Sequence, residues 1–205
     1  MNALILVDIQ NDFIPGGSLA VQRGDEIIPL VNELQQSFDL VVATQDWHPK
    51  DHKSFASSHA GKKPFEKIIL HGIDQVLWPD HCIQGTPGAE FSDRLKMNKV
   101  ETIFRKGMDA EIDSYSGFYD NGYKRSTGLA GYLRERKVSK VYLCGLAGDY
   151  CVFYTAKDAL KENFDVFIVE DATRSIDEKR FEKAKSEILA AGGQVIRSET
   201  LYRHL

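Results

Sequence analysis

Short apolar runs alternate with segments of helical periodicity along most of this chain. Six of the runs have the length and composition of buried strands: Ala3–Val7, Leu40–Thr44, Thr102–Phe104, Val141–Cys144, Val166–Val169 and Val195–Ile196. Apolar residues at three- and four-residue steps predict helices in four further segments: Asp25–Ser37, Thr127–Lys137, Val152–Leu160 and Glu178–Ala191. Strands that alternate with helices are typical of a parallel sheet with helices on both faces. We therefore predict an α/β fold.

The segment from Pro49 to Lys99 interrupts this alternation, because it is rich in loop residues and contains four of the six prolines. A loop of that length within a compact domain usually has a function or contains small elements of its own. The sequence has no internal repeat and no low-complexity tract. We expect a single domain over residues 1–205, with a loop-rich segment at about residues 46–99.

The composition narrows the classes of partner. A hydrophobic fraction of 42% and a charged fraction of 27% are ordinary for a soluble globular protein. The formal net charge is −4 and basic residues are not clustered, so neither nucleic acid nor a membrane is expected as a partner. No apolar run has the length of a membrane span, and the first residues have the pattern of a strand, not of a signal peptide. Three cysteines argue against a disulfide framework and favour the reducing cytoplasm.

Polar residues that follow the strands are the first candidates for a site, because sheets of this kind bind ligands at the carboxyl ends of their strands. Asp8 and Lys106 each end a strand, and Cys151 follows a glycine-flanked turn where we expect a helix to begin. The unpaired N–H groups of a helix start favour a thiolate. Each residue alone has an ordinary explanation as a turn cap, a solvated strand end or a buried filler. Together they supply a proton acceptor, a positive charge and a sulfur nucleophile, the set required for covalent acyl transfer.

A second cluster has the composition of a metal site. Asp46 and His48 lie two residues apart, so both side chains can reach one point from an extended segment, and His81 offers a third ligand. One carboxylate and two imidazoles suit zinc, iron or manganese. His52 is a further candidate, whereas Cys82, next to His81, is expected to point the other way. The alternative is a set of histidines that titrate on a surface loop; their number and spacing favour the metal.

These residues resemble the isochorismatase-like cysteine hydrolases, and within them the nicotinamidases, also called pyrazinamidases. The resemblance runs nearly from end to end, through Val7–Phe13, Pro15–Val21, Asp46–Pro49, His52–Phe55, Trp78–Cys82, Gly85–Gly88, Lys106–Gly107, Tyr115–Phe118 and Gly145–Cys151. The Asp, Lys and Cys alone would indicate the wider family. The Asp-x-His with the later Trp-Pro-x-His-Cys is the mark of nicotinamidases, since other relatives generally lack that metal site.

The resemblance implies a Rossmann-like, three-layer fold around a doubly wound six-stranded sheet. It also implies hydrolysis of nicotinamide to nicotinate and ammonia in NAD salvage, with pyrazinamide accepted as well. Cys151 would be the nucleophile that forms a thioester, Asp8 the carboxylate that moves the proton, and Lys106 the electrostatic partner. One divalent ion (zinc, iron or manganese) would be held by Asp46, His48 and His81. His52 matches a position that ligates the ion in some relatives and acts without direct contact in others.

The same resemblance implies a cis peptide bond between Leu146 and Ala147, and an oxyanion hole made by the backbone N–H groups of Ala147 and Cys151. The residues that would line the pocket for the ring are Phe13, Leu19, Trp78, Tyr115 and Leu146. Tyr150 departs from relatives that have histidine beside the nucleophile.

Three alternatives remain at this point. The chain could be another amide hydrolase of the family, or a metal hydrolase in which bound water attacks and Cys151 is a bystander. It could also be a non-catalytic nucleotide-binding module, although no Gly-x-Gly-x-x-Gly follows a strand. The sequence leaves open the identity of the metal and whether the chain forms a homo-oligomer.

Overall fold

Six parallel strands form one sheet in the computed structural model, which describes residues 1–204. The strands are β1 (Asn2–Val7), β2 (Leu40–Asp46), β5 (Val100–Lys106), β6 (Lys140–Gly145), β7 (Asp165–Thr173) and β8 (Gln194–Ile196). Their order, β5-β2-β1-β6-β7-β8, means that the chain starts in the middle of the sheet, builds toward one edge and then returns to build the other. This is the doubly wound arrangement. Each strand overlaps one of the six predicted runs, so the predicted fold is confirmed.

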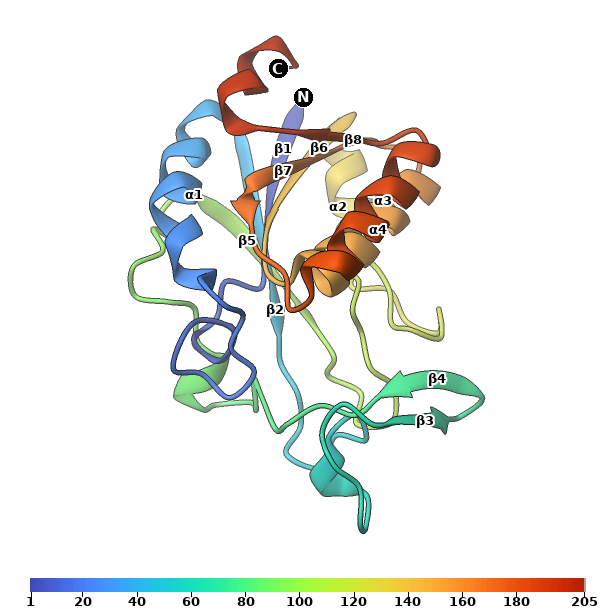
Figure 1. The fold of residues 1–205 in the computed structure, drawn as a ribbon. Helices are drawn as coiled ribbons and strands as arrows, with labels where there is room; N and C mark the ends of the chain where they lie inside the picture. The colour runs from blue at the N-terminus through green and yellow to red at the C-terminus, as the bar shows by residue number, and fades with distance from the viewer. Residues whose placement is uncertain (205) are drawn as a thin grey trace.

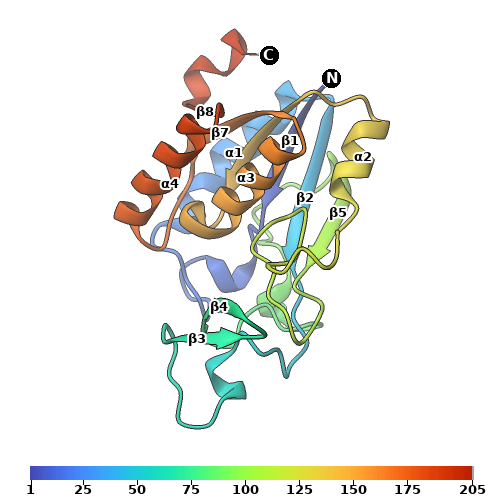
Figure 2. The same cartoon turned by 90° about the vertical axis from the view of Figure 1, so that its right-hand side faces the viewer.

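Helices cover both faces of this sheet. The four α-helices are α1 (Ile28–Leu34), α2 (Leu129–Glu135), α3 (Phe153–Lys161) and α4 (Glu178–Ala190). Helix α1 lies on one face, between the 3-10 turns η2 (Gly24–Ile27) and η3 (Gln35–Ser37), and the other three lie on the opposite face (Figures 1 and 2). All four predicted helices form, with ends shifted by a few residues. None of the helices in residues 1–204 has both the length and the apolarity that crossing a membrane requires.

The position of each strand in the sheet explains its sequence pattern. Strands β1, β2 and β6 are covered on both faces, so their residues are almost all buried and their sequences are nearly continuous apolar runs. Strand β5 lies at an edge and alternates exposed with less exposed residues. Its last residue, Lys106, is nevertheless buried, as is Asp46 at the end of β2. Buried charges of this kind require partners.

The residue expected at a helix start lies instead in a wider turn that precedes the helix. A π-helical turn, η6 (Gly148–Val152), contains Cys151 and leads into α3, which begins at Phe153. In this turn the N–H of Val152 donates to the carbonyl of Ala147, five residues back, at 3.1 Å. The predicted start of the helix therefore needs correction. The first helical turn after the strand is a π-turn, whose hydrogen bond spans five residues, and the α-helix begins only at Phe153.

The loop-rich segment folds over the carboxyl ends of the strands and contains small elements, as expected. These are the antiparallel hairpin β3 (Lys67–Leu70) and β4 (Ile73–Val76) and the 3-10 turns η4 (Ala56–Ser58) and η5 (Pro87–Ala89). Two further 3-10 segments, η1 (Asn11–Phe13) and η7 (Ser198–Arg203), follow β1 and β8. Figure 1 shows the hairpin at the opposite end of the molecule from the two termini. The segment thus lies over the edge where the polar strand ends meet.

Candidate active site

The order of the strands brings three charged side chains and the cysteine to one edge of the sheet. Asp8 follows β1, Asp46 ends the neighbouring β2, and Lys106 ends β5 on the far side of β2. Cys151 lies in the turn that follows β6, which pairs with β1 on its other side. All four residues are buried. Asp8, Lys106 and Cys151 therefore lie together at one edge of the sheet, as the sequence predicted.

Lys106 is the centre of this cluster. Its ammonium nitrogen lies 2.9 Å from Asp8 Oδ2 and 2.5 Å from Asp46 Oδ1, and it donates to the carbonyl of Ser114 at 3.0 Å. It also lies 3.5 Å from Cys151 Sγ. Burial lowers the pKa of Lys106, but the charges of Asp46 and Asp8 outweigh burial and raise it well above its usual value. Lys106 is therefore a fixed positive charge beside the sulfur.

Burial raises the pKa of both Cys151 and Asp8. Burial raises the pKa of Cys151 well above its usual value; Lys106 opposes this rise, and Asp8 and Asp46 add to it. Burial also raises the pKa of Asp8, against the opposing charge of Lys106, and Asp8 Oδ1 accepts a hydrogen bond from Thr44 Oγ1 at 2.7 Å. Burial of the thiol therefore disfavours the thiolate expected from a helix start, and the two nearby carboxylates add to this effect. A thiol beside a carboxylate is an arrangement in which attack requires a general base.

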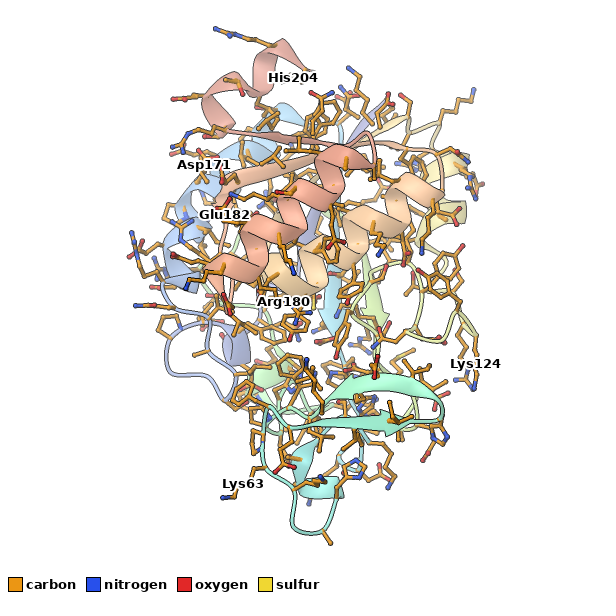
Figure 3. The ribbon with its side chains drawn as sticks, turned by 45° about the vertical axis from the view of Figure 1, so that its right-hand side comes forward. Lys63, Lys124, Asp171, Arg180, Glu182 and His204 are labelled. Carbon is orange, nitrogen blue, oxygen red and sulfur yellow. The ribbon has the colours of Figure 1, made fainter. Side chains whose placement is uncertain are left out.

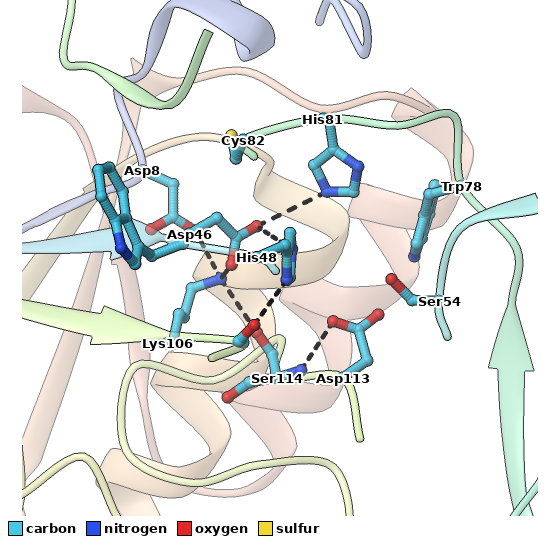
Figure 4. A network of polar contacts seen from close by, with 12 residues as sticks. Asp8, Asp46, His48, Ser54, Trp78, His81, Cys82, Lys106, Asp113 and Ser114 are labelled. Carbon is cyan, nitrogen blue, oxygen red and sulfur yellow. Dashed lines mark hydrogen bonds and ion pairs between the residues drawn. The ribbon is translucent and has the colours of Figure 1, made fainter. Parts of the chain in front are cut away.

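Three buried side chains next to this cluster have the arrangement of a divalent-metal site. Asp46 Oδ2 lies 3.6 Å from His48 Nε2 and 3.9 Å from His81 Nε2 (Figure 4). His48 Nδ1 lies 2.9 Å from the carbonyl of Gly107, and His81 Nδ1 lies 2.8 Å from the carbonyl of Pro79. A carbonyl only accepts, so each Nδ1 carries the hydrogen and each Nε2 presents its lone pair to the common point.

The chemistry of this donor set fits a divalent ion. His48 Nε2 is buried and has no hydrogen-bond partner among the described residues. Burial lowers the pKa of His81 to about 4, helped by the neighbouring His48, so His81 is a neutral ligand at ordinary pH. A carboxylate and two imidazoles, each oriented by a backbone carbonyl, are typical of sites for zinc and similar metals. Cys82 belongs to none of the clusters of ligand-type atoms found in residues 1–204.

His52 presents a different nitrogen to the site. Its Nδ1 accepts the backbone N–H of Ser54 at 3.2 Å and lies 2.7 Å from Ser54 Oγ. Burial lowers the pKa of His52 to about 4, so the ring is neutral and its single hydrogen is on Nε2. His52 also forms a cluster of ligand-type atoms with His48 and Asp113, and its Nε2 has no hydrogen-bond partner among the described residues. His52 therefore lies beside the metal triad with an N–H where His48 and His81 have lone pairs.

An aromatic cavity opens beside Cys151. Four of the five residues expected to line it do so, namely Phe13, Leu19, Trp78 and Tyr115. Leu146 is not among the lining residues found in residues 1–204; it is fully buried beside Gly24. The ring of Tyr150 lies 4.8 Å from that of Trp78 and 5.4 Å from that of Tyr115. The walls are therefore suited to a flat ring.

The turn before the nucleophile has the geometry that the resemblance implied. The Leu146–Ala147 peptide bond is cis. Ala147 and Cys151 both line the cavity, together with Asp46 and His81 from the metal triad. Cys151, two members of the metal triad and the aromatic walls thus face one space.

Three residues of this site carried no recognised signal in the sequence: Thr44, Asp113 and Ile176. Thr44 pairs in register with Val7, just before Asp8, so a hydroxyl at the end of an apolar run was its only signal. Asp113 lies in an irregular loop, and Ile176 follows β7, distant in sequence from every other lining residue. Only the folded chain brings these side chains to the cavity.

Comparison with known proteins places this architecture in a family. Residues 2–200 match the isochorismatase domain. This chain belongs to the isochorismatase family. Within the family it is 49% identical to a nicotinamidase of Acinetobacter baylyi, over 97% of this chain and 94% of that protein.

Solved structures of the isochorismatase family agree closely with this fold. A nicotinamidase/pyrazinamidase of Acinetobacter baumannii is 49% identical and superposes with a TM-score of 0.95, covering 98% of this chain and 97% of its own. A pyrazinamidase of Pyrococcus horikoshii in complex with zinc is 40% identical, with a TM-score of 0.79 over 96% of this chain and 98% of its own. The six-stranded sheet and the helices on both faces are thus those of the isochorismatase family.

Proposed function

We propose that this chain is a nicotinamidase, an amidohydrolase of NAD salvage that acts as one cytoplasmic domain over residues 1–205. It converts nicotinamide and water to nicotinate and ammonia, and it also accepts pyrazinamide. One observation carries the proposal: Cys151 from a buried Asp8–Lys106–Cys151 cluster lines the same aromatic cavity as Asp46 and His81 from the Asp46–His48–His81 triad. Similarity over nearly the whole chain to enzymes named for this activity supports it.

Asp8, Lys106 and Cys151 perform the first half of the reaction. Cys151 Sγ attacks the carboxamide carbon while Asp8 takes the thiol proton, and Lys106 balances the negative charge that remains. The backbone N–H groups of Ala147 and Cys151 hold the carbonyl oxygen as it becomes an oxyanion. The carbon–nitrogen bond then breaks, Asp8 returns its proton to the nitrogen, and ammonia leaves a thioester behind.

The second half uses the same groups in reverse. Asp8 accepts a proton from water as the water oxygen attacks the thioester carbon. The carbon–sulfur bond breaks, the proton returns from Asp8 to Cys151 Sγ, and nicotinate is released. Because Lys106 keeps its charge throughout, the buried site never holds two uncompensated carboxylates.

Asp46, His48 and His81 would hold one divalent ion, for which iron and manganese are suitable and zinc is the proposed metal. When bound, such an ion supplies a Lewis acid that can hold the pyridine nitrogen and orient the ring. The zinc-bound pyrazinamidase relative supports the choice of zinc. We do not assign His52 as a ligand, because its Nδ1 accepts the backbone N–H of Ser54, which leaves the hydrogen of the neutral ring on Nε2.

Ammonia release by the purified protein, with metal analysis of the same sample, tests the proposal. The wild type should release ammonia from nicotinamide, and Cys151→Ala should release none. Rapid acid quenching should trap a nicotinoyl thioester on Cys151, detectable by mass spectrometry. Near-normal turnover in Cys151→Ala would instead favour direct attack by water, and activity on other amides with none on nicotinamide would indicate a different hydrolase of the family.

A further inference from the structure

The wall of the cavity opposite the buried aromatic residues is formed by Ile176, on the connection between β7 and α4. Phe13, Leu19, Trp78 and Tyr150 are each at most 9% exposed, whereas Ile176 is 38% exposed. Ile176 also lines a wide cleft of about 570 Å³ on its other side, whose lining includes Arg23, Arg174 and several carboxylates. Ile176 thus lines both the small aromatic cavity and the large polar cleft. Figure 3 labels Asp171 and Glu182 in that cleft and Arg180 at the start of α4.

The carboxylate of Asp149 holds this wall in place. Its Oδ1 accepts the N–H of Ile176 at 2.9 Å, and its Oδ2 accepts the N–H of Asp177 at 3.2 Å. Asp149 is 1% exposed and lies two residues before Cys151, in the π-helical turn. A buried carboxylate is costly unless its oxygens are hydrogen-bonded, and here both oxygens bond to the backbone of the wall.

Further contacts tie the same two segments together. The N–H of Gly148 donates to the carbonyl of Arg174 at 2.7 Å, and Arg180 Nε donates to the carbonyl of Asp149 at 3.3 Å. The guanidinium of Arg180 also lies 3.8 Å from the centroid of the Tyr150 ring, which is itself a wall of the cavity. The nucleophile turn and the β7–α4 connection are thus one hydrogen-bonded unit, and Ile176 is the side chain that this unit presents to the substrate.

We infer that Ile176 determines the substrate specificity of the site by excluding pyridine carboxamides with a further ring substituent, and that Asp149 is the positioning residue that holds it. The inference rests on the proposed nicotinamidase function. The aromatic walls suit a flat unsubstituted ring, whereas a substituent on the side of the ring that faces Ile176 would have to occupy the space of that side chain. With the wall shortened, a polar substituent would reach the wide cleft, where it could be solvated and meet charged groups.

The first test compares the wild type with Ile176→Ala on nicotinamide and on nicotinamides that carry a hydroxymethyl group at one ring carbon, each available carbon in turn. For at least one isomer, the ratio of its kcat/KM to that of nicotinamide should rise roughly 10- to 100-fold, the range typical of changes in pocket volume. The KM for nicotinamide itself should rise a few-fold, because apolar contact is lost. Ile69→Ala is the matched control, since Ile69 is 68% exposed on the β3–β4 hairpin and should leave every ratio unchanged.

The second test addresses Asp149. Asp149→Asn keeps the shape but places an NH2 group against one of the two backbone N–H donors, so it should release the wall and shift the same ratio in the same direction. In the double variant with Ile176→Ala the two shifts should not add, because both changes act through one side chain. Hydrogen exchange of the wild type provides a measurement that needs no variant: the amides of Ile176 and Asp177 should exchange as slowly as those of the central strands.

The outcomes separate the inference from the function on which it rests. Absence of nicotinamide turnover by the wild type would overturn the proposed function and this inference with it. If the wild type turns over nicotinamide normally and Ile176→Ala has the same kcat/KM ratios as the wild type, the inference is overturned and the proposed function stands. A uniform fall of kcat for all amides in Asp149→Asn, or rapid exchange of the two amides, would overturn the positioning role of Asp149.

Discussion

Lys106 is the residue at which the two halves of the site meet. Its ammonium group contacts Asp8, which we assign to proton transfer, and Asp46, which we assign to the metal. Asp46 can serve both because Oδ1 faces Lys106 while Oδ2 faces the histidines. The cost of burying three charges is offset because each has an opposite partner within contact distance. Lys106 therefore contacts both the residues assigned to the chemistry of the sulfur and a residue assigned to metal binding.

Because Asp8 and Lys106 act on the same proton and sulfur, their losses should not add. Asp8→Asn and Lys106→Met should each reduce kcat/KM by about two to three powers of ten, the scale of general acid–base catalysis. The double variant should be little worse than either single variant. Steady-state kinetics with nicotinamide measures this, and Cys144→Ala, a buried cysteine outside the site, serves as the control with near-normal activity. A loss equal to the product of the two single losses would show that the residues act independently.

The pH dependence of the reaction should report the carboxylate of Asp8. Burial raises the pKa of Asp8 above its ordinary value near 3.8, and Asp8 must be ionised to accept the thiol proton. Activity should therefore be present above this raised pKa and lost as the pH falls through it. The acid limb of kcat/KM should lie above the ordinary aspartate range, with the metal content of the protein measured at each pH as the control. A limb at or below about pH 4 would contradict this assignment.

Alanine substitutions of the three histidines at the site should differ in their effect on the metal content of the protein. His48→Ala and His81→Ala should each lose most of the bound metal, since each removes a lone pair directed at the common point. His52→Ala should keep close to one ion per chain, because its Nε2 carries a hydrogen. Elemental analysis of the purified variants distinguishes these results. A metal-free His52→Ala protein with an intact fold would make His52 a ligand after all.

At the scale of elements, the site depends on how closely strand ends and loops approach one another. Gly107, directly after β5, has a φ of +66°, and a Cβ built there would lie 2.3 Å from Cε1 of His48. The carbonyl of this glycine is also the group that orients His48. A residue without a side chain is required here both by backbone conformation and by space.

Gly107→Ala should therefore displace His48 and reduce metal binding. It should also destabilise the fold by about 1 kcal/mol or more, the scale of a strained backbone position. Metal analysis and thermal unfolding measure the two effects. Gly131→Ala is the matched control, because Gly131 lies in α2 with no atom within 4 Å of the added carbon and should be neutral or slightly stabilising. Full metal content in Gly107→Ala would show that the ring of His48 can move without loss.

At the scale of the whole molecule, the metal ligands come from β2 and from the loop-rich segment that lies over the strand ends. An ion that binds this arrangement and not the unfolded chain stabilises the fold by mass action. Chelation should therefore abolish nicotinamide hydrolysis and lower the melting temperature, and added zinc should restore both. At a free metal concentration about 100 times the dissociation constant, the gain is about 2.7 kcal/mol. A stoichiometrically metal-free protein with full activity and an unchanged melting temperature would remove the metal from the proposal.

The sequence by itself determined the strands, the helices and the principal chemical groups. Apolar runs such as Ala3–Val7 and Val141–Cys144 are strongly constrained, because a strand buried on both faces admits few polar residues. Asp8, Lys106 and Cys151 could be recognised for the same reason, since each is a polar or reactive residue next to such a run. The Asp46–His48 spacing carried the metal prediction, because two residues of an extended segment share one side.

Tertiary structure decided what depends on distance through space. Pairing of Val7 with Thr44 brings a hydroxyl to Asp8, and the order of the strands places Lys106 between two carboxylates. The raised pKa of Cys151 follows from burial among those carboxylates, which no local pattern encodes. Ile176 lines the cavity, and its N–H is bonded to Asp149, which is distant from it in sequence. Local sequence fixes which elements form, whereas contacts between distant segments determine which side chains share one space and which charges they experience there.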